Sequence, residues 1–355
     1  MSGALIDLVS KGVQDAYLTG DPQVSFYRQN YKRYTNFAMK PVELNKVGTS
    51  GPNSECVFKI DPAGDLLTYV WCDVETIGDA DSQAQTIQVS EAFTPTEFAL
   101  YIGGMEVDRQ DGFFINSLWP KFLATTPSKC VEPSGLAANQ RFFPLHFFNC
   151  DNITTPIPLV ALQYHGVEIK VRSGAKVNSG TFKMYGNYVM LDTEERKWFT
   201  DNQHEMLITQ TQRIQADASG SDLSYLNHPV KGLFWGQAVE DTLSTSDVQL
   251  NLNGTSVFNN NMPAKYFNTV SMYQHSENAV PNAAGITTDT AKYMYSFATA
   301  VNKHQPTGTC NFSRLDNAKL TWTGTGGTGT PTFLYGVNYN ILRVKDGLGG
   351  VMFSN

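Results

Sequence analysis

Apolar and polar residues alternate in short runs along most of this chain, and turn residues separate the runs. Alternation with a period of two is typical of strands with one buried face, and clusters of Gly, Pro, Asn and Asp end such strands. The pattern predicts strands at Cys56–Ile60, Leu66–Ile77, Ile157–Tyr164, Val167–Arg172, Thr181–Met190, Met206–Gln215, Val230–Val239, Tyr293–Ala300, Ala318–Thr323 and Thr332–Lys345.

Two β-hairpins are predicted as well, because two-residue turns of hairpin type separate two pairs of strands. Gly103-Gly104 lies between Phe98–Ile102 and Met105–Arg109. Asn253-Gly254 lies in the same way between Val248–Leu252 and Thr255–Phe258. Both dipeptides accept the positive φ angles that tight hairpin turns require.

Helical patterns occur at two places only. Residues 3–17 space Leu5, Leu8 and Val9 for one face of a short amphipathic helix, whose apolar stripe needs a surface to lie on. Residues 192–201 begin with Asp192 as a potential N-cap, three residues before Glu195, and continue with good helix formers. The second helix divides the strands into two runs.

Two runs of short strands, with a helix between them, favour two successive β-sandwiches or barrels over an α/β enzyme. The length of 355 residues agrees with more than one domain. Hydrophobic residues make up 41% and charged residues only 17%, which suits a surface that packs broadly against other proteins.

The net charge of -7 gives no general electrostatic reason to bind nucleic acid. One basic stretch, with Arg28, Lys32 and Arg33 among Phe and Tyr residues, has the composition of a stacking and phosphate-binding segment. We interpret it instead as a structured arm whose aromatic residues are buried while its charges face water or a neighbouring molecule. No specific nucleic acid is therefore expected as a partner.

Candidate chemistry is sparse. Five scattered Cys residues and six His residues form no metal-ligand spacing, and no nucleophile elbow occurs, so neither a metal, a cofactor nor a catalytic site is expected. The N-terminus lacks the pattern of a signal peptide, and no apolar run is long enough to span a bilayer. The pairs Asp73/Glu75 and Glu106/Asp108 lie two apart on strands, which is the arrangement of carboxylates in jelly-roll glycosidases.

Three glycosylation sequons occur, at Asn152, Asn253 and Asn311. Asn253 is expected to be the most accessible because it lies in a hairpin turn. Without a secretion signal, chance matches are the simpler explanation.

A loop and strand at His304–Trp322 combine turn residues with several polar side chains. We predict that Arg314, Asp316 and Asn317 form a hydrogen-bonded corner there, in which Arg314 or Asp316 is at least partly buried.

Several long stretches, in this order, resemble the major capsid proteins of nucleocytoplasmic large DNA viruses of the algal and giant virus type. They are GVQDAYLTGDPQVSFYRQNYKRYTNFAM (12–39), IPLVALQYHGVEIKV (157–171), LDTEERKWF (191–199), LNHPVKGLFW (226–235), YMYSFA (293–298), HQPTGTCNFSRLDNAKL (304–320) and GVNYNILRVKDGLGGVMFSN (336–355).

The resemblance implies an all-β double jelly roll. It consists of an N-terminal arm with a short helix (1–24), a first eight-stranded jelly roll (25–200) and a second one (201–355). It also implies a homotrimer that forms a pseudo-hexagonal capsomer in an icosahedral shell, assembled in the host cytoplasm. Partners would be neighbouring capsomers, minor capsid and penton proteins and, through Leu5, Leu8, Val9, Arg28, Lys32 and Arg33, components on the inner side of the shell, including a membrane surface.

Two alternatives remain at this point. The chain is shorter than is usual for the family, which leaves open a minor capsid or assembly-scaffold protein with the same fold. The paired carboxylates leave open a carbohydrate-binding or carbohydrate-active double β-sandwich.

Overall fold

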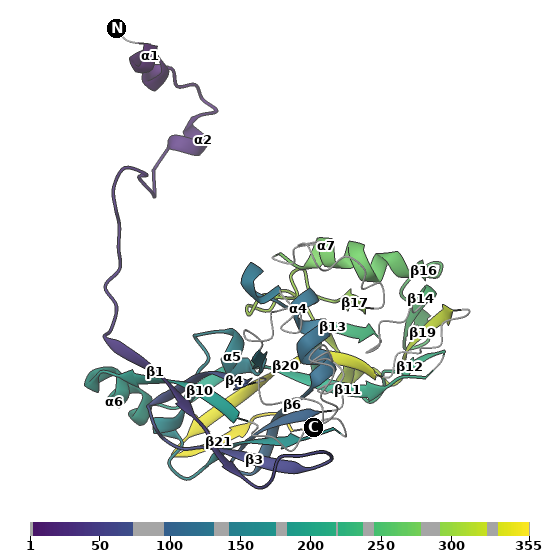
Figure 1. The fold of residues 1–355 in the computed structure, drawn as a ribbon. Coiled ribbons are helices and arrows are strands. Elements are labelled where there is room, and N and C mark those ends of the chain that lie inside the picture. Colours follow the sequence, from purple (N-terminus) through teal and green to yellow (C-terminus); the bar gives the residue numbers. More distant parts are fainter. Residues whose placement is uncertain are drawn as a thin grey trace, which may run out of the picture. The chain divides into compact units, whose positions relative to one another are not determined.

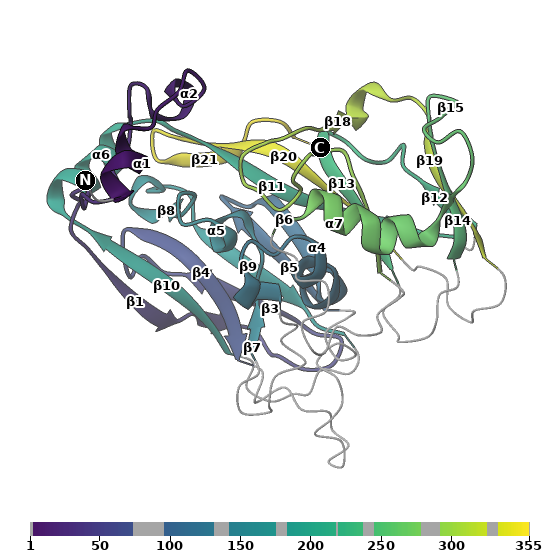
Figure 2. The ribbon, with the colours of Figure 1, turned by 90° about the horizontal axis from the view of Figure 1, so that it is seen from above.

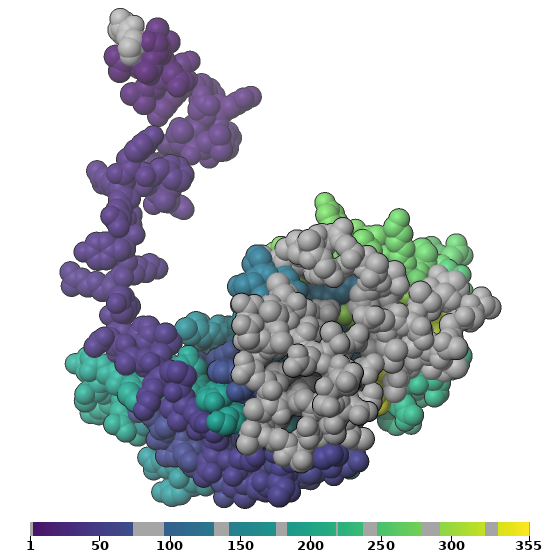
Figure 3. Space-filling model, viewed as in Figure 1, coloured from purple at the N-terminus to yellow at the C-terminus, as the bar shows by residue number. Residues whose placement is uncertain are grey.

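The computed structural model describes residues 3–73, 96–130, 142–174, 183–217, 219–236, 245–277, 292–324 and 333–354. By its internal contacts the chain divides into two units, Met1–Asn36 and Phe37–Asn355. The first unit is an extended segment, which we call the arm, with two short helices, α1 (Gly3–Val9) and α2 (Ala16–Thr19), neither of which has a buried residue. Its side chains project along its whole length (Figure 3). The single helix expected at 3–17 is thus interrupted, and the arm continues beyond residue 24.

The first half of the large unit, residues 37–191, contains two antiparallel sheets. One sheet has the order β1-β10-β4-β7, with β8 paired to β4, and the other has the order β2-β3-β9-β5-β6. The strands are β1 (Phe37–Glu43), β2 (Asn45–Val47), β3 (Glu55–Ile60), β4 (Leu66–Asp73), β5 (Glu97–Ile102), β6 (Met105–Asp111), β7 (Phe142–Pro144), β8 (Ile157–Pro158), β9 (Val167–Arg172) and β10 (Lys183–Leu191).

The second half, residues 204–351, repeats this plan. One sheet has the order β11-β20-β13-β17, with β18 paired to β13 and β21 to β20, and the other has the order β12-β19-β14-β15, with β16 paired to β14. The strands are β11 (His204–Gln215), β12 (Gly220–Asp222), β13 (Pro229–Gly236), β14 (Thr245–Leu252), β15 (Thr255–Ser256), β16 (Met262–Pro263), β17 (Lys292–Ser296), β18 (Cys310–Asn311), β19 (Ala318–Gly324), β20 (Phe333–Lys345) and β21 (Leu348–Val351). Figure 2 shows β1, β4 and β10 of the first half on one side of the unit and β12, β14 and β19 of the second half on the other, while β20 and β21 extend over the first half.

Short helices connect the strands. Helix α6 (Thr193–Asp201) separates the halves as predicted, and Asp192 caps it by accepting a hydrogen bond from the Thr193 amide. Each half also has a helix of the same construction, a five-residue π-helical turn followed directly by an α-helical turn. These are η1 (Phe114–Leu118) with α4 (Trp119–Phe122), and η6 (Tyr266–Val270) with α7 (Ser271–His275). Helix α5 (Phe148–Asp151) and the 3₁₀ turns η2 (Pro127–Cys130), η5 (Leu159–Ala161) and η7 (Phe312–Arg314) complete the described elements.

Both predicted hairpins are confirmed. Gly103 and Gly104 have φ angles of 60° and 81° between β5 and β6, and Asn253 and Gly254 have φ angles of 48° and 77° between β14 and β15. Positive φ at both turn residues matches the right-handed twist of the paired strands.

One predicted strand is largely wrong, and several described strands were not predicted, namely β1 and the short strands β2, β7, β12, β16, β18 and β21. The run Ile157–Tyr164 leaves the sheet after Pro158, which has no amide to continue the ladder, and forms the turn η5. Strand β1 lacks the alternating signal because it lies at a sheet edge and six of its seven residues are exposed. Parts of the predicted strands at 66–77, 181–190, 230–239 and 332–345 lie outside the described residues.

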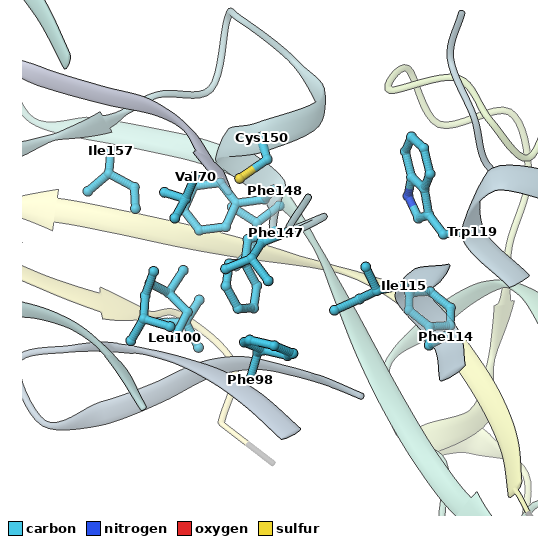
Figure 4. Close-up of a cluster of buried hydrophobic side chains, with 14 of the residues drawn as sticks. Val70, Phe98, Leu100, Phe114, Ile115, Trp119, Phe147, Phe148, Cys150 and Ile157 are labelled. Carbon is cyan, nitrogen blue, oxygen red and sulfur yellow. The ribbon is translucent and has the colours of Figure 1, made fainter. Parts of the chain in front are cut away.

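The cores of both halves consist of inward-facing strand residues and the helices. In the first half, Phe98, Leu100 and Phe147 point toward one another beneath Val70 and Ile157 (Figure 4). All five are at most 1% exposed, which is the packing expected of a dry protein interior.

The sheet that contains β13 and β20 is buried on both faces. On β13, Phe234 belongs to the core shared with the first half, while its neighbours Leu233 and Trp235 belong to the core of the second half. On β20, Tyr335 belongs to the core shared with the first half, and Leu334 belongs to the core of the second half. Since successive strand residues face opposite sides, this sheet packs against both halves and joins them into one unit. In Figure 1, β20 and β11 run between the strands of the first half and helix α7.

Candidate functional site

Each of the three sequon asparagines uses its side-chain oxygen as a hydrogen-bond acceptor, Asn152 and Asn311 within a local turn and Asn253 toward a distant loop. Asn152 accepts a hydrogen bond from the Thr154 amide at 3.0 Å, and Asn311 accepts one from the Ser313 amide at 3.1 Å. Asn253 and Asn311 are exposed, whereas Asn152 is half-buried. Modification of these residues stays a prediction.

The predicted polar corner is hydrogen-bonded, but not by the side chains that we expected. Arg314, Asp316 and Asn317 are all exposed, so the predicted burial of Arg314 or Asp316 is wrong. Asn253 makes the corner instead, because its Oδ1 accepts from the amides of Asp316 at 3.1 Å and Asn317 at 3.3 Å. A hairpin turn and the loop before β19 are thereby joined through backbone groups, which leaves the charged side chains in solvent.

The arm residues selected from the sequence are all exposed. Leu8 is 67% exposed and Val9 78%, and Leu5, Arg28, Lys32 and Arg33 are exposed as well. The expected burial of the arm's aromatic residues is wrong, since Phe26 and Tyr27 are exposed too. An apolar row of this kind, exposed to water in the single chain, indicates a surface that another molecule covers.

The carboxylates of Glu106 and Asp108 do not form a catalytic pair. The register of β6 against β5 shifts between Leu100 and Tyr101. Glu106 therefore faces outward, where its carboxylate pairs with the Arg109 guanidinium at 2.6 Å. Asp108 points inward and is 4% exposed. Of the other pair, Glu75 lies outside the described residues.

Asp108 belongs to a polar network at the junction of the two halves. Its Oδ1 accepts a hydrogen bond from the Thr211 amide of β11 at 2.7 Å, and its Oδ2 accepts one from Gln110 at 2.8 Å. Burial raises the pKa of Asp108 to about 7, against the opposing effect of these hydrogen bonds. The sequence pattern did not indicate this role, because a charged residue in a predicted strand is expected to face solvent.

A second part of the network joins Asp111 of β6 to Arg213 of β11. Arg213 donates to Asp111 at 3.1 Å and to Glu97 at 2.6 Å, and the Tyr335 hydroxyl donates to Asp111 at 2.7 Å. Burial acts to lower the pKa of Arg213, yet the two carboxylates raise it above its usual value. Burial nevertheless raises the pKa of Asp111, against the opposing effects of Tyr335 and Arg213. The hydrogen bonds and ion pairs of this cluster link the two halves.

A cavity of about 350 Å³, which we call the junction cavity, opens beside this network. Residues of the first half that line it include His146 and Asp151, and those of the second half include Lys231 and His304. The His146 ring stacks on Trp119 with 3.5 Å between ring centres. No spacing in the sequence indicated this site, because its residues come from distant strands and loops.

No group of three or more His, Cys, Asp or Glu side chains suited to a metal ion occurs in the described part of the chain. Within the same ranges, no helix has both the length and the apolar character needed to cross a membrane.

Two β-sandwiches in tandem, with extensive polar and apolar contact between them and an extended apolar arm, define the class of double jelly-roll proteins. Solved structures of that class have the same fold. VP54 of PBCV-1 superimposes with a TM-score of 0.76 at 24% sequence identity, covering 93% of this chain and 100% of VP54. The Faustovirus major capsid protein has a TM-score of 0.66 at 10% identity, covering 96% of each chain.

Sequence relatives identify the family. The family "Large eukaryotic DNA virus major capsid protein" matches residues 236–350, and "Major capsid protein N-terminus" matches residues 25–192. The major capsid protein of Pyramimonas orientalis virus is 32% identical and that of Paramecium bursaria Chlorella virus 1 is 28% identical, each over the full length of both chains. The chain belongs to the major capsid proteins of large eukaryotic DNA viruses.

Its function is therefore structural: it forms the capsid shell of the virion and is not an enzyme. This membership replaces both alternatives, the minor or scaffold protein and the carbohydrate-binding β-sandwich.

Proposed function

We propose that three copies of this chain form a pseudo-hexagonal capsomer, and that such capsomers tile an icosahedral shell. The observation that carries the proposal is the two-sandwich unit, in which a shared sheet buried on both faces joins two halves of the same plan. Three such units around one axis present six sandwiches, and closed threefold symmetry repeats every contact three times.

The domain boundaries are part of this proposal. We assign residues 37–200 and 201–355 to the two jelly rolls, so that the first begins at Phe37 and not at residue 25 as expected from the sequence. The assignment is supported by the sheets, since each described strand pairs within its own side of α6. The segment before Phe37 acts as a separate arm.

Light scattering coupled to gel filtration tests the trimer. We expect a particle of three times the chain mass at micromolar concentration, over a wide range of salt. A monomer that persists at high concentration in every salt condition would contradict the proposal.

The arm is proposed to contact minor capsid or penton proteins on the inner side of the shell, which assembles in the host cytoplasm. For the helical part of the arm, residues 3–24, a protein partner is favoured over the internal membrane, because this part carries one Lys but Asp7, Asp15 and Asp21, which repel anionic headgroups. Phe26 and Tyr27, 91% and 100% exposed, would supply apolar contacts.

Substitution of the two exposed aromatic residues of the arm tests this contact. The double variant Phe26→Ser/Tyr27→Ser is expected to leave the trimer intact but to reduce its incorporation into particles. Tyr273→Ser, at an exposed aromatic residue of α7, is the matched control and should assemble normally. Normal incorporation of the arm variant would contradict the proposal, and binding to anionic vesicles that the arm variant loses would identify the membrane as the partner.

A further inference from the structure

The junction cavity has walls from both halves of the large unit. On the side of the first half it is lined by His146 and Asp151, near α5. On the side of the second half it is lined by Thr209 and Thr211 of β11 and by Lys231 of β13. Any molecule bound here contacts both β-sandwiches.

Most charges in this cavity are already paired. Lys303 pairs with Glu277 at 2.7 Å. Asp151 lies 3.2 Å from Nδ1 of His146 and 3.9 Å from the ammonium of Lys129. These contacts use both carboxylates that line the cavity.

Lys231 is the exception. Its side chain lies over the ring of Tyr339, with Nζ 5.6 Å from the ring centre, and the residue is only 6% exposed. Among the described residues, no carboxylate lies within ion-pair distance of Nζ and no hydrogen-bond acceptor contacts it. Burying an ammonium without an ionic or hydrogen-bonding partner costs several kcal/mol, and an anion or water in the cavity reduces that cost.

Neutral hydrogen-bonding groups are also available. No hydrogen bond within the described part of the chain involves the hydroxyls of Thr209 and Thr211. Nε2 of His146 also has no partner, but it is fully buried and so offers no surface to a molecule in the cavity. An oxyanion carries several acceptor oxygens on one molecule, so it can accept from the Lys231 ammonium and from the two threonine hydroxyls together.

We propose that the junction cavity binds a small oxyanion of the phosphate class, with Lys231 as the cationic ligand, and that the anion holds the two halves together. A halide would satisfy the ammonium, but as a single atom it offers no further acceptor oxygens to the hydroxyls of Thr209 and Thr211. The cavity volume leaves space for ordered water beside the anion. The proposal goes beyond the capsid role and does not depend on the trimer.

The charge state of Lys231 agrees with this role. Burial lowers the pKa of Lys231 to about 8, against the attraction of Asp151, so the ammonium is still mainly charged at pH 7. Burial and the charge of Lys231 together lower the pKa of His304, which also lines the cavity. Anion binding should therefore weaken as the pH rises above 8.

Thermal unfolding of the full chain in increasing phosphate, at constant ionic strength kept with sodium chloride, tests the proposal. At pH 7 we expect the Tm of the wild type to rise with phosphate and to level off, because a ligand that binds only the folded state stabilises it. Lys231→Met should remove this rise. It should still fold, because Met fills similar space without an unpaired charge. Lys265→Met removes an exposed positive charge and should respond like the wild type.

Calorimetric titration of the wild type with phosphate at pH 7 and pH 9.5 provides a second measurement, which needs no variant. Affinity at least tenfold weaker at pH 9.5 is expected. The proposal is overturned if phosphate has no effect beyond that of chloride, which would leave water in the cavity. An equal response of Lys231→Met, or equal affinity at both pH values, would overturn it as well.

Discussion

Asp108 shows how a single buried carboxylate can make the stability of this protein depend on pH. It accepts hydrogen bonds from the amides of Thr211 and Arg109 and from Gln110, yet burial outweighs them and raises its pKa to about 7. The unfolded carboxyl titrates near 3.8. Between these values the folded state holds a proton that the unfolded state has lost. The stabilising effect is thus present at low pH and is lost as the pH rises to 7.

We expect Asp108→Asn to remove this dependence, because an amide has no charge to bury. The variant should gain stability relative to the wild type as the pH rises from 5 to 8. Urea unfolding of both proteins across this range measures the difference. A difference that stays constant with pH would show that Asp108 does not titrate there.

Asn253 has two possible roles that substitution can separate. It adopts a positive φ of 48° and its Oδ1 accepts two backbone hydrogen bonds. Asn253→Ala should therefore lower the free energy of unfolding by about 1–3 kcal/mol, through backbone strain and lost hydrogen bonds. Thr255→Ala removes the sequon but keeps Asn253, so it should preserve stability. Mass spectrometry of virion protein from the two variants then reports glycosylation alone.

At the scale of elements, β13 matters most, because it packs on both of its faces. Phe234 and Trp235 are adjacent, both are fully buried, and they face the shared core and the second core respectively. Neither role follows from the strand pattern, since a continuous apolar run carries no information about which element covers each face.

Truncation of Phe234 and of Trp235 should lower the free energy of unfolding by similar amounts but should loosen different strands. Phe234→Ala and Trp235→Ala are each expected to destabilise the chain by about 3–5 kcal/mol through lost burial and a cavity. Hydrogen exchange should accelerate in β5 and β6 for Phe234→Ala, and in β14 and β19 for Trp235→Ala. The same pattern in both variants would show that the two cores do not respond separately.

At the scale of the whole molecule, the two halves are joined by charge as well as by apolar packing. Arg213 lies between Asp111 and Glu97, and Tyr335 donates to the same buried Asp111. Ion pairs that are exposed contribute little, but removing one partner of a buried group leaves its charge uncompensated.

Arg213→Met should accordingly destabilise the chain by about 2–4 kcal/mol, because Asp111 is then buried without its cation. Asp111→Asn in the same chain should restore part of that loss, since the amide carries no charge. A double-mutant cycle from urea unfolding measures the coupling between the two residues. Additive effects would mean that the pair does not join the halves energetically.

Sequence reasoning succeeded where the signal is local. Both hairpins, the cap at Asp192 and most strands were predicted correctly, because turn geometry and alternation depend only on neighbouring residues. It failed at Ile157–Tyr164, where an apolar run forms a turn, and at the exposed edge strand β1. The corner was placed correctly but assigned to Arg314 and Asp316, because the loop containing Asn253 is distant in the chain.

The sequence by itself determined the all-β class, the two runs of strands and the resemblance to capsid proteins, since these follow from local pattern and from long matching stretches. Only the tertiary structure decided which charges are buried. Asp108, Asp111 and Lys231 are polar residues in strands, which usually face water, and they are buried because one sheet packs against both halves. The desolvation that sets their chemistry depends on neighbours up to hundreds of residues away, as the Asp111–Tyr335 contact shows.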